Sequence, residues 1–597
     1  MTVSVSTGKI DLGLERITRF LEHILPEDPR VNLRVVHVAG TNGKGSVCAL
    51  VSEAAIAAGY KVGIFNSPHF LDPNDAIRIQ GKPISAAEYA ELRAWIVSLD
   101  VAAQSPDGLL TPFEQTTVTA IWWFARHSVD LAVIEVGMGG LRDATNVFGL
   151  ADGQSSPLGV GRSLVQCICP VDKDHVGVIG DTIDEIAREK AGIMRPGSWI
   201  IIANQERLDA LHRIRQTAHR NSTERVVNIH RLPFSDTHAS NFSSLAAPII
   251  RDAPIMPGWA KFNSINPRCL EVKYPPSLDA YTKSRQFSPT DSTTIAPAVA
   301  STASAPDVAP MSIKLELPLV LPGKHQAGNA SVAFYALYVL RTYYGYDKLT
   351  DAAIHTGFQN ISWPGRLSWL PLEHSPLYSS NAGALPPVGD EAAAAALDCK
   401  PGLSSRSSTS SGRSGHTSDR SSADMASSDG LNMWILADGA HNEAAAAELR
   451  KYVDVTLRRF AMNNYGRNKS SHRLNGTPPV RWIVGFSHGK AMTAILNHLV
   501  LAGDTLWLVP FSKPSEMPWV NCAATEDIYR AAQELPDFGQ IDVDKFDSLA
   551  SALDCLADAN ADSHLNVLCG SLYLVADLYR ELKVRPFDTP GSAINGN

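Results

Sequence analysis

The sequence has few cysteines, and they form no recognisable metal or disulfide pattern. Eight cysteines are scattered over 597 residues, with no C-x-x-C pair and no histidine and cysteine at zinc-ligand spacing. This distribution favours a reducing compartment. We therefore expect a cytoplasmic protein, with the mitochondrion as the alternative.

The sequence also lacks long apolar runs and an excess of basic charge. No stretch reaches the roughly 18 uninterrupted apolar residues of a membrane-spanning helix, and the N-terminal segment has no apolar signal core. The net charge of −8 gives no general attraction for nucleic acid or for an anionic membrane. We expect neither as a partner, so any anionic ligand must be bound by local groups.

Short β-branched runs alternate with helical patterns, and the chain is too long for a single core. Strands are predicted at Val35 to Ala39, Val62 to Phe65, Leu131 to Val136, Leu164 to Cys169, Trp199 to Ala203 and Val226 to Ile229, and helices at Ser46 to Ala58, Glu88 to Leu99, Phe113 to His127, Thr182 to Met194 and Glu206 to Arg220. This alternation is typical of a mostly parallel sheet with helices on both faces. Such sheets bind ligands at the carboxyl ends of their strands.

The alternation restarts at Met433, which predicts a second, smaller α/β domain. The expected strands are Trp434 to Ala437, Arg481 to Phe486, Thr505 to Pro510 and Leu565 to Cys569, and the expected helices are near Glu443 to Val453, Ala491 to Val500, Thr525 to Leu535 and Ser571 to Leu582.

Two low-complexity stretches interrupt these patterns. Residues 284–311 are rich in Ser, Thr, Ala and Pro, and residues 404–429 hold twelve serines in 26 residues. We predict one domain over residues 1–362, with a disordered insertion at about 284–311. A second domain is predicted over residues 363–597, with a disordered insertion at about 375–431.

The segment Gly40-Thr-Asn-Gly-Lys-Gly-Ser46 lies between a predicted buried strand and a predicted helix. Backbone N–H groups of a glycine-rich turn bind oxyanions together with the positive end of the following helix, and Lys44 adds a charge for terminal phosphates. The hydroxyl arrives one residue later than in the common G-x-x-x-x-G-K-[ST] loop, at Ser46. We predict a nucleoside triphosphate here; a glycine-rich turn without a ligand is the alternative.

Charged residues follow other predicted strands at the same edge. Glu135 ends an apolar strand, where an unpaired carboxylate is costly, so it pairs either with a basic side chain or with Mg²⁺. Asp174-His175 follows the next strand, and Lys190 lies near the end of a helix. A loop contact and a solvated lysine at a helix end are the alternatives for these residues.

In the second domain, Asp438-Gly-Ala-His-Asn442 again leads from a strand to a helix. Asp438 can accept from a ribose hydroxyl or an ammonium group, His441 can donate to phosphate or carboxylate, and Asn442 can cap the helix. Trp363-Pro-Gly-Arg366 lies where the domains should join. Arg366 suits a phosphate clamp, with a surface hinge arginine as the alternative.

In this order, the segments resemble the folylpolyglutamate synthase and dihydrofolate synthase family, relatives of the Mur peptide ligases. The landmarks are Gly40 to Ser46, Ser67-Pro-His69, Thr111-Pro-Phe-Glu114, Glu135-Val-Gly-Met-Gly-Gly140, Asp143-Ala-Thr-Asn146, Asp174-His175, Glu189-Lys-Ala-Gly-Ile193, Gly323-Lys-His-Gln326 with Asn329, Trp363 to Arg366 and Asp438 to Asn442. Gly13 to His23, Glu516-Met-Pro-Trp519 and Leu568 to Leu574 look most like the fungal dihydrofolate synthases.

The resemblance implies a P-loop ATPase-like domain of the Mur ligase type, followed by a Rossmann-like glutamate ligase domain. ATP would phosphorylate the carboxylate of dihydropteroate, and the amino group of L-glutamate would attack the acyl phosphate to give dihydrofolate. The first alternative is a folylpolyglutamate synthase, or a bifunctional enzyme, that extends the glutamyl tail of reduced folates. The second is a non-catalytic nucleotide-binding regulatory protein. We expect a monomer.

The resemblance also implies the site residues. ATP would contact Gly40, Thr41, Asn42, Gly43, Lys44, Gly45, Ser46, His325, Gln326, Asn329, Arg366 and Asp438; the pterin would contact Ser67, Pro68, His69, Phe113 and Glu114; Ser67, Glu135, His175 and Lys190 would bind two Mg²⁺; and Lys44, His175, Lys190, Arg366, Asp438 and His441 would serve catalysis. Family members carry a carbamylated lysine at the position of Lys190. Burial, by lowering a lysine pKa, exposes the neutral amine that reacts with carbon dioxide.

Two positions depart from the family's pattern. The family usually reads Gly-Gly-Arg-Leu where this chain has Gly139-Gly-Leu-Arg142, so Arg142 is displaced by one position. The apolar residue that the family has before Asp-His is here Lys173. The second metal site is the assignment that these departures affect.

Overall fold

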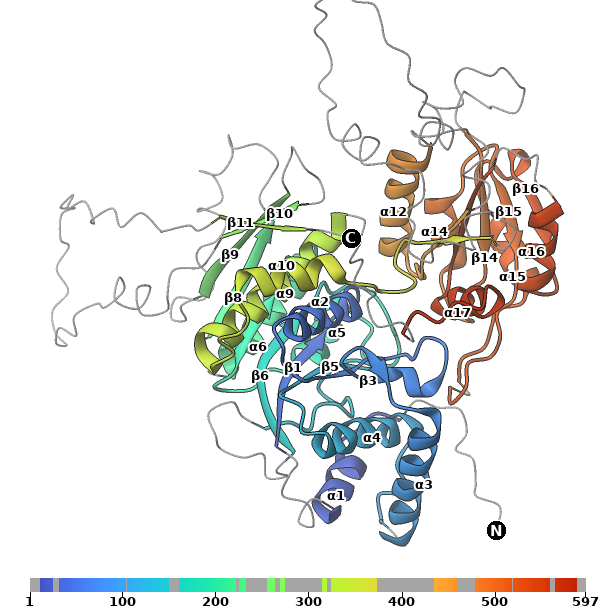
Figure 1. Ribbon diagram of the computed structural model, residues 1–597. Helices are drawn as coiled ribbons and strands as arrows, with labels where there is room; N and C mark the ends of the chain where they lie inside the picture. The colour runs from blue at the N-terminus through green and yellow to red at the C-terminus, as the bar shows by residue number, and fades with distance from the viewer. Residues whose placement is uncertain are drawn as a thin grey trace, which may run out of the picture.

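The computed structural model describes residues 11–24, 32–103, 105–149, 160–221, 225–231, 255–262, 269–273, 314–318, 321, 324–372, 434–458, 478–517, 519–558 and 564–587. These residues form two lobes, each built on one sheet (Figure 1). The insertions predicted at 284–311 and 375–431 lie outside the described residues. No helix of the described ranges has the length and apolar character to cross a bilayer.

The first sheet has the strand order β11-β10-β9-β8-β7-β6-β1-β5-β2-β3-β4. Its strands are β1 (Leu33–Ala39), β2 (Val62–Phe65), β3 (Ile77–Ile79), β4 (Lys82–Pro83), β5 (Leu131–Glu135), β6 (Gly161–Ile168), β7 (Trp199–Ile202), β8 (Val226–Arg231), β9 (Ile255–Phe262), β10 (Cys269–Lys273) and β11 (Lys314–Pro318). The pairs from β9 to β2 are parallel, as predicted, and the pairs at both edges are antiparallel. Because β1 lies between β5 and β6, the loops after these three strands meet at one edge.

Helices cover both faces of this sheet because its central strands are apolar on both sides. In β1, Val36 and Val38 face one apolar cluster while Val35 faces another. The first cluster contains residues of α2 (Lys44–Ala57), α9 (Lys324–Tyr344) and α10 (Asp351–Asn360). The opposite face is covered by α1 (Glu15–Ile24), α3 (Ala86–Ala103), α4 (Pro112–Arg126), α5 (Ile183–Ala191) and α6 (Leu208–Arg220). A short helical turn, η2, spans Pro73–Ala76.

The second sheet has the order β12-β13-β17-β14-β15-β16, and only β12 is antiparallel. Its strands are β12 (Ser368–Pro371), β13 (Trp434–Ala437), β14 (Val480–Val484), β15 (Thr505–Leu508), β16 (Asp542–Lys545) and β17 (Leu565–Cys569). Its helices are α12 (Glu443–Tyr452), η6 (Val453–Arg458), α14 (Met492–Leu499), α15 (Thr525–Gln533), η7 (Phe538–Gln540), α16 (Leu549–Asp558) and α17 (Leu572–Glu581). Phe70 and Leu71 of the first lobe pack into the apolar cluster of α16 and α17, so the two lobes share buried surface.

Candidate functional site

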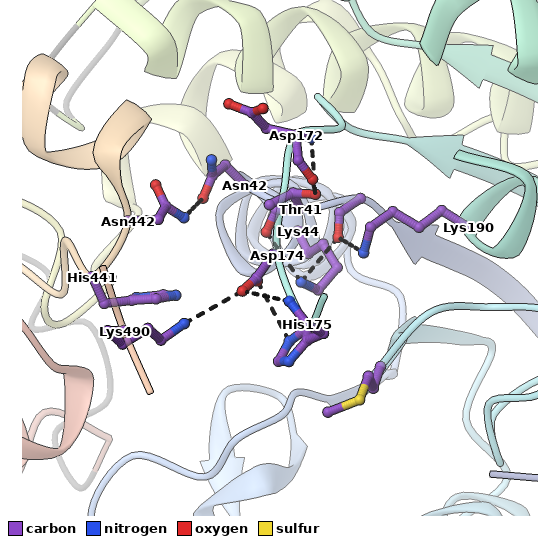
Figure 2. Close-up of polar contacts among 12 residues, drawn as sticks. Thr41, Asn42, Lys44, Asp172, Asp174, His175, Lys190, His441, Asn442 and Lys490 are labelled. Atoms are coloured by element: carbon purple, nitrogen blue, oxygen red, sulfur yellow. Dashed lines mark hydrogen bonds and ion pairs between the residues drawn. The ribbon is translucent and has the colours of Figure 1, made fainter. Parts of the chain in front are cut away.

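The glycine-rich segment forms the turn between β1 and α2. Gly40 and Gly43 have positive φ, 148° and 91°. A Cβ on Gly43 would lie 2.2 Å from Asn329 Oδ1, so the turn passes close to α9. Lys44 Nζ donates to the carbonyl oxygens of Gly40 (3.2 Å) and Thr41 (3.4 Å), which places its charge over the turn (Figure 2). This arrangement can bind an anion.

Glu135, at the end of β5, lies beside this turn and is buried. Its Oε1 is 4.0 Å from Lys44 Nζ, and its Oε2 accepts a 2.8 Å hydrogen bond from Asn66 Nδ2. Burial raises the pKa of Glu135, while Lys44 and the Asn66 hydrogen bond oppose this shift. The neighbouring Ser67 Oγ is buried and has no hydrogen-bond partner among the described residues. Two adjacent oxygen donors, one of them unsatisfied, suit a hard cation such as Mg²⁺.

Lys190 and His175 approach the turn from α5 and from the loop after β6 (Figure 2). Lys190 is buried and Nζ donates to the carbonyl oxygen of Gly40 at 2.9 Å. Burial, together with the charge of Lys44, lowers the pKa of Lys190 to about 7. His175 Nε2 lies 3.4 Å from Asp174 Oδ2, and burial lowers the pKa of His175 to about 4, so its imidazole is neutral at pH 7.

Within the described residues, no group of three or more His, Cys, Asp and Glu side chains could hold a metal ion. A second metal near His175 would therefore need a further ligand. A lysine amine is cationic or neutral and supplies no oxygen, whereas a carbamylated Lys190 would supply an anionic one.

The two departures from the family's pattern have simple structural outcomes. Arg142 Nε lies 3.3 Å from both carboxylate oxygens of Glu189, and the Arg142 backbone N–H donates to Oε1 at 3.1 Å. Arg142 therefore pairs with the residue that precedes Lys190. The Lys173 side chain is exposed, and its backbone N–H donates to Asp172 Oδ1 at 2.8 Å.

In the second lobe, Asp438 follows β13 and is buried. Its two oxygens accept 2.9 Å hydrogen bonds from the backbone N–H groups of Leu367 and Ala440. Burial raises the pKa of Asp438, while the Arg366 guanidinium opposes the shift. A Cβ on Gly439 would lie 2.6 Å from Arg366 Nη1, so the glycine permits this close approach.

His441 and Asn442 continue the same loop toward the first lobe. His441 Nδ1 donates to the carbonyl oxygen of Gly439 at 2.8 Å, and burial lowers the pKa of the imidazole to about 4. Asn442 caps α12 by accepting from the N–H of Ala445 at 2.9 Å, as predicted. Its Nδ2 also donates to Asn42 Oδ1 at 3.2 Å, which joins the second lobe to the glycine turn.

Lys490 is the site residue that the sequence analysis missed. Its Nζ lies 3.3 Å from Asp174 Oδ1, across the two lobes (Figure 2). Although burial favours protonation, His175 and then Lys490 hold the pKa of Asp174 well below its usual range. The sequence gives no local signal for it, because Asp438 directly follows β13, whereas β14 ends at Val484, well before Lys490.

Of the predicted nucleotide residues of α9, Asn329 lies against the glycine turn. Asn329 Nδ2 donates to Gln326 Oε1 at 2.8 Å, and both side chains are buried. His325 lies one position earlier and is exposed. Since Asn329 would clash with any Cβ on Gly43, this part of α9 borders the turn directly.

The predicted pterin residues have mixed environments. The Phe113 ring stacks on Phe65 with centroids 6.0 Å apart, and a Cβ on Gly137 would lie 2.3 Å from Phe113 Cζ. His69 is buried, and its Nε2 has no hydrogen-bond partner among the described residues. Pro68 joins His69 to Ser67.

Glu114 has a structural task in α4. Its Oε2 accepts from the N–H of Thr111 at 2.6 Å, which completes a capping box with Thr111. The same oxygen also accepts from Arg16 Nε at 3.0 Å. Its Oε1 is buried without a hydrogen-bond partner among the described residues.

Comparison with known proteins adds independent findings. Residues 421–581 match the family model described as dihydrofolate synthetase, C-terminal domain. The chain is 26% identical over 575 residues to the probable dihydrofolate synthetase of Schizosaccharomyces pombe, covering 96% of this chain and 99% of the relative. It is 26% identical over 574 residues to the dihydrofolate synthetase of Saccharomyces cerevisiae, covering 96% and 98%.

Among solved structures, the fold is similar to that of a bifunctional folylpolyglutamate synthase/dihydrofolate synthase from Yersinia pestis, complexed with AMPPNP and a Mn ion. The TM-score is 0.59 at 20% sequence identity, and the match covers 97% of this chain and 96% of the other. At this identity the likeness shows a shared fold.

Proposed function

Since the chain belongs to the folylpolyglutamate synthase and dihydrofolate synthase family, we propose that it is a dihydrofolate synthase. It joins L-glutamate to dihydropteroate with ATP, and it releases ADP and phosphate. Residues 1–362 form the ATP-binding domain in this proposal, and residues 363–597 form the glutamate ligase domain. The enzyme acts as a monomer in the cytoplasm.

One observation carries the proposal: polar and charged side chains from both lobes meet at the glycine turn and beside it. Lys44 and Lys190 bond to its carbonyl oxygens, and Asn442 of the second lobe donates to Asn42 within it. Lys490 adds another cation at Asp174. The fixed charges of Lys44 and Lys490 suit a reaction that brings a triphosphate and carboxylates together.

The reaction balances without an external oxidant or reductant. A carboxylate oxygen of dihydropteroate attacks the γ-phosphorus of ATP, and ADP leaves. The glutamate nitrogen then attacks the acyl carbon, loses a proton, and phosphate leaves as the amide forms. Lys44 would bind the β- and γ-phosphates, and Arg366, Asp438 and His441 would bind the nucleotide and the developing charges from the second lobe.

The other substrate contacts follow the geometry of the first lobe. His325, Gln326 and Asn329 would border the nucleotide, since Asn329 touches the glycine turn. The unpaired His69 Nε2 and the Phe113 ring offer the pterin a polar and an aromatic contact.

The residues at the turn fit Mg²⁺ because Ser67 Oγ lacks a partner beside the Glu135 carboxylate. When bound, Mg²⁺ would neutralise charge on the phosphate oxygens. We assign Ser67 and Glu135 to one metal site, and His175 with carbamylated Lys190 to a second. The buried Lys190 amine, with a pKa of about 7, suits the reaction with carbon dioxide.

A folylpolyglutamate synthase, or an enzyme with both activities, is the second candidate, because the similar Yersinia pestis structure is named for both. Purified protein should be given ATP, L-glutamate and either dihydropteroate or a reduced folate monoglutamate. We expect glutamate incorporation with dihydropteroate. Turnover with the folate alone would reverse the order, and ATP hydrolysis that is indifferent to both acceptors would indicate a regulatory protein.

A further inference from the structure

The C-terminal tail, defined here as residues 582–587, follows α17 and reaches the first lobe. Arg585 pairs with Asp72, an exposed contact. Phe587 packs near Phe70 and Trp363, with ring centroids 6.4 Å away in each case. The tail therefore contacts both the first lobe and the linker between the sheets.

Phe587 covers the guanidinium of Arg78, which is buried at 4% exposure. The Arg78 Cζ lies 4.4 Å from the Phe587 centroid and 5.4 Å from the Trp363 centroid. Arg78 takes part in none of the ion pairs found among the described residues. Burial lowers the pKa of Arg78, and nearby carboxylates, that of Asp75 first, oppose this shift. The two ring faces beside the guanidinium favour the same charged form.

Arg78 links this aromatic pair to the glycine turn. It donates to the carbonyl oxygen of Asp75 at 2.8 Å and to Asn66 Oδ1. Asn66 in turn donates through Nδ2 to Glu135 Oε2 at 2.8 Å. Since Arg78 occupies the amide oxygen, the amide is oriented with its N–H₂ group toward Glu135.

Trp363 touches the same site from another side. A Cβ on Gly45 would lie 2.7 Å from Trp363 Cζ2 and 3.4 Å from Glu135 Oε2. The Trp363 ring, which helps to cover Arg78, therefore also borders the glycine turn and the Glu135 carboxylate.

We propose that the C-terminal tail positions Glu135 from the second lobe. Phe587, with Trp363, holds Arg78; Arg78 orients Asn66; and Asn66 fixes the carboxylate that receives the metal. Arg78, Asn66 and Phe587 are positioning residues. The inference rests on the proposed function, in which Glu135 binds the divalent cation.

The test uses the full-length protein with ADP and Mn²⁺, and measures free Mn²⁺ by electron paramagnetic resonance. Phe587→Leu keeps apolar bulk but removes the ring. We expect its Kd for Mn²⁺ to rise about three- to tenfold. Phe587→Tyr, which keeps the ring, should bind Mn²⁺ as the wild type does. Arg585→Ala is the matched control, because it removes the exposed contact of the same tail and should leave the Kd unchanged.

Thermal melting without metal separates positioning from stability. A Phe587→Leu protein with a lower melting temperature but the wild-type Kd for Mn²⁺ would overturn the inference. Asn66→Ala tests the same connection closer to the carboxylate and should weaken Mn²⁺ binding at least as much. Glu135→Gln separates failure of the metal assignment from failure of the tail's role. Unchanged Mn²⁺ binding in Glu135→Gln would refute the metal assignment itself. If Glu135→Gln loses Mn²⁺ binding while Phe587→Leu keeps the wild-type Kd, only the role of the tail is refuted.

Discussion

Lys490 and Asp174 are 316 positions apart in the chain, yet Lys490 Nζ lies 3.3 Å from Asp174 Oδ1. Lys490 follows β14 of the second sheet, and Asp174 follows β6 of the first. Asp174 also contacts His175, so this ion pair connects the second lobe to the proposed second metal site.

We expect Lys490→Met to lower kcat/KM for ligation about tenfold, because it leaves the largely buried Asp174 without its cation. The measurement is steady-state kinetics with each substrate varied in turn. Lys513→Met, on the exposed surface of the same lobe, is the control for loss of one positive charge. Equal kcat/KM values for the two variants would show that Lys490 does not contribute to the reaction.

Lys44→Ala should reduce ATP turnover by more than about 100-fold while the fold persists, because the phosphates lose their nearest fixed charge. Circular dichroism melting and a coupled ADP assay give the two readouts. Lys82→Ala, an exposed lysine of β4, is the matched control. Near-normal turnover in Lys44→Ala would exclude the glycine turn from the mechanism.

Gly43→Ala should weaken ADP binding about tenfold or more. Its φ is 91°, and the added Cβ would lie 2.2 Å from Asn329 Oδ1, so the turn and α9 must move apart. Gly59→Ala is a close control, with φ of 81° and no atom within 4 Å of the added Cβ. We expect Gly59→Ala to cost about 1–3 kcal/mol of stability and to leave ADP affinity unchanged. Isothermal titration calorimetry measures the ADP affinity of each variant, and urea unfolding measures its stability. Equal ADP affinities of Gly43→Ala and Gly59→Ala would contradict the prediction.

His37 should contribute to acid sensitivity. It is buried against Thr145 Oγ1 (2.8 Å), and burial, with the Arg195 charge, lowers the pKa of His37 to about 3. Between this value and the ordinary pKa near 6.5, the unfolded chain binds more protons than the folded one. The unfolding free energy therefore falls as the pH drops from about 6.5 toward 3, by up to about 1.4 kcal/mol per pH unit.

Replacing His37 by Gln should accordingly reduce the difference in melting temperature between pH 7 and pH 5. His212→Gln, an exposed histidine of α6, should leave that difference as in the wild type. An unchanged difference in His37→Gln would mean that other groups dominate the acid response.

The elements predicted best are those with strong local patterns. The predicted strands Val62–Phe65, Trp434–Ala437 and Leu565–Cys569 have the same bounds in the structure. Several elements escaped prediction: α1, α9, α10, α16, β3, β4, β9 to β12 and β16. The edge strands β3 and β4 have three and two residues, too few for a period-two pattern. Helix α9 carries apolar residues on all sides because it is almost wholly buried, so it shows no amphipathic stripe.

The candidate site likewise contains residues that a local sequence pattern predicts and residues that no local pattern predicts. Gly40 to Ser46, Glu135 and Asp438 each stand at the end of an apolar strand, and that position is visible in the sequence. Lys490, Arg78 and Phe587 carry no comparable local signal, since their importance depends on neighbours from distant segments.

Residues close together along the chain encode the alternation of strands and helices, the glycine turn with its lysine, and the family resemblance, so these features are visible without a structure. Which charges meet depends instead on how distant segments pack. Contacts such as Lys490 with Asp174, or Phe587 with Arg78, arise when the two lobes bury shared apolar surface around Phe70 and Leu71. That burial is non-directional and long-range in sequence, so no local pattern encodes the pairings it produces.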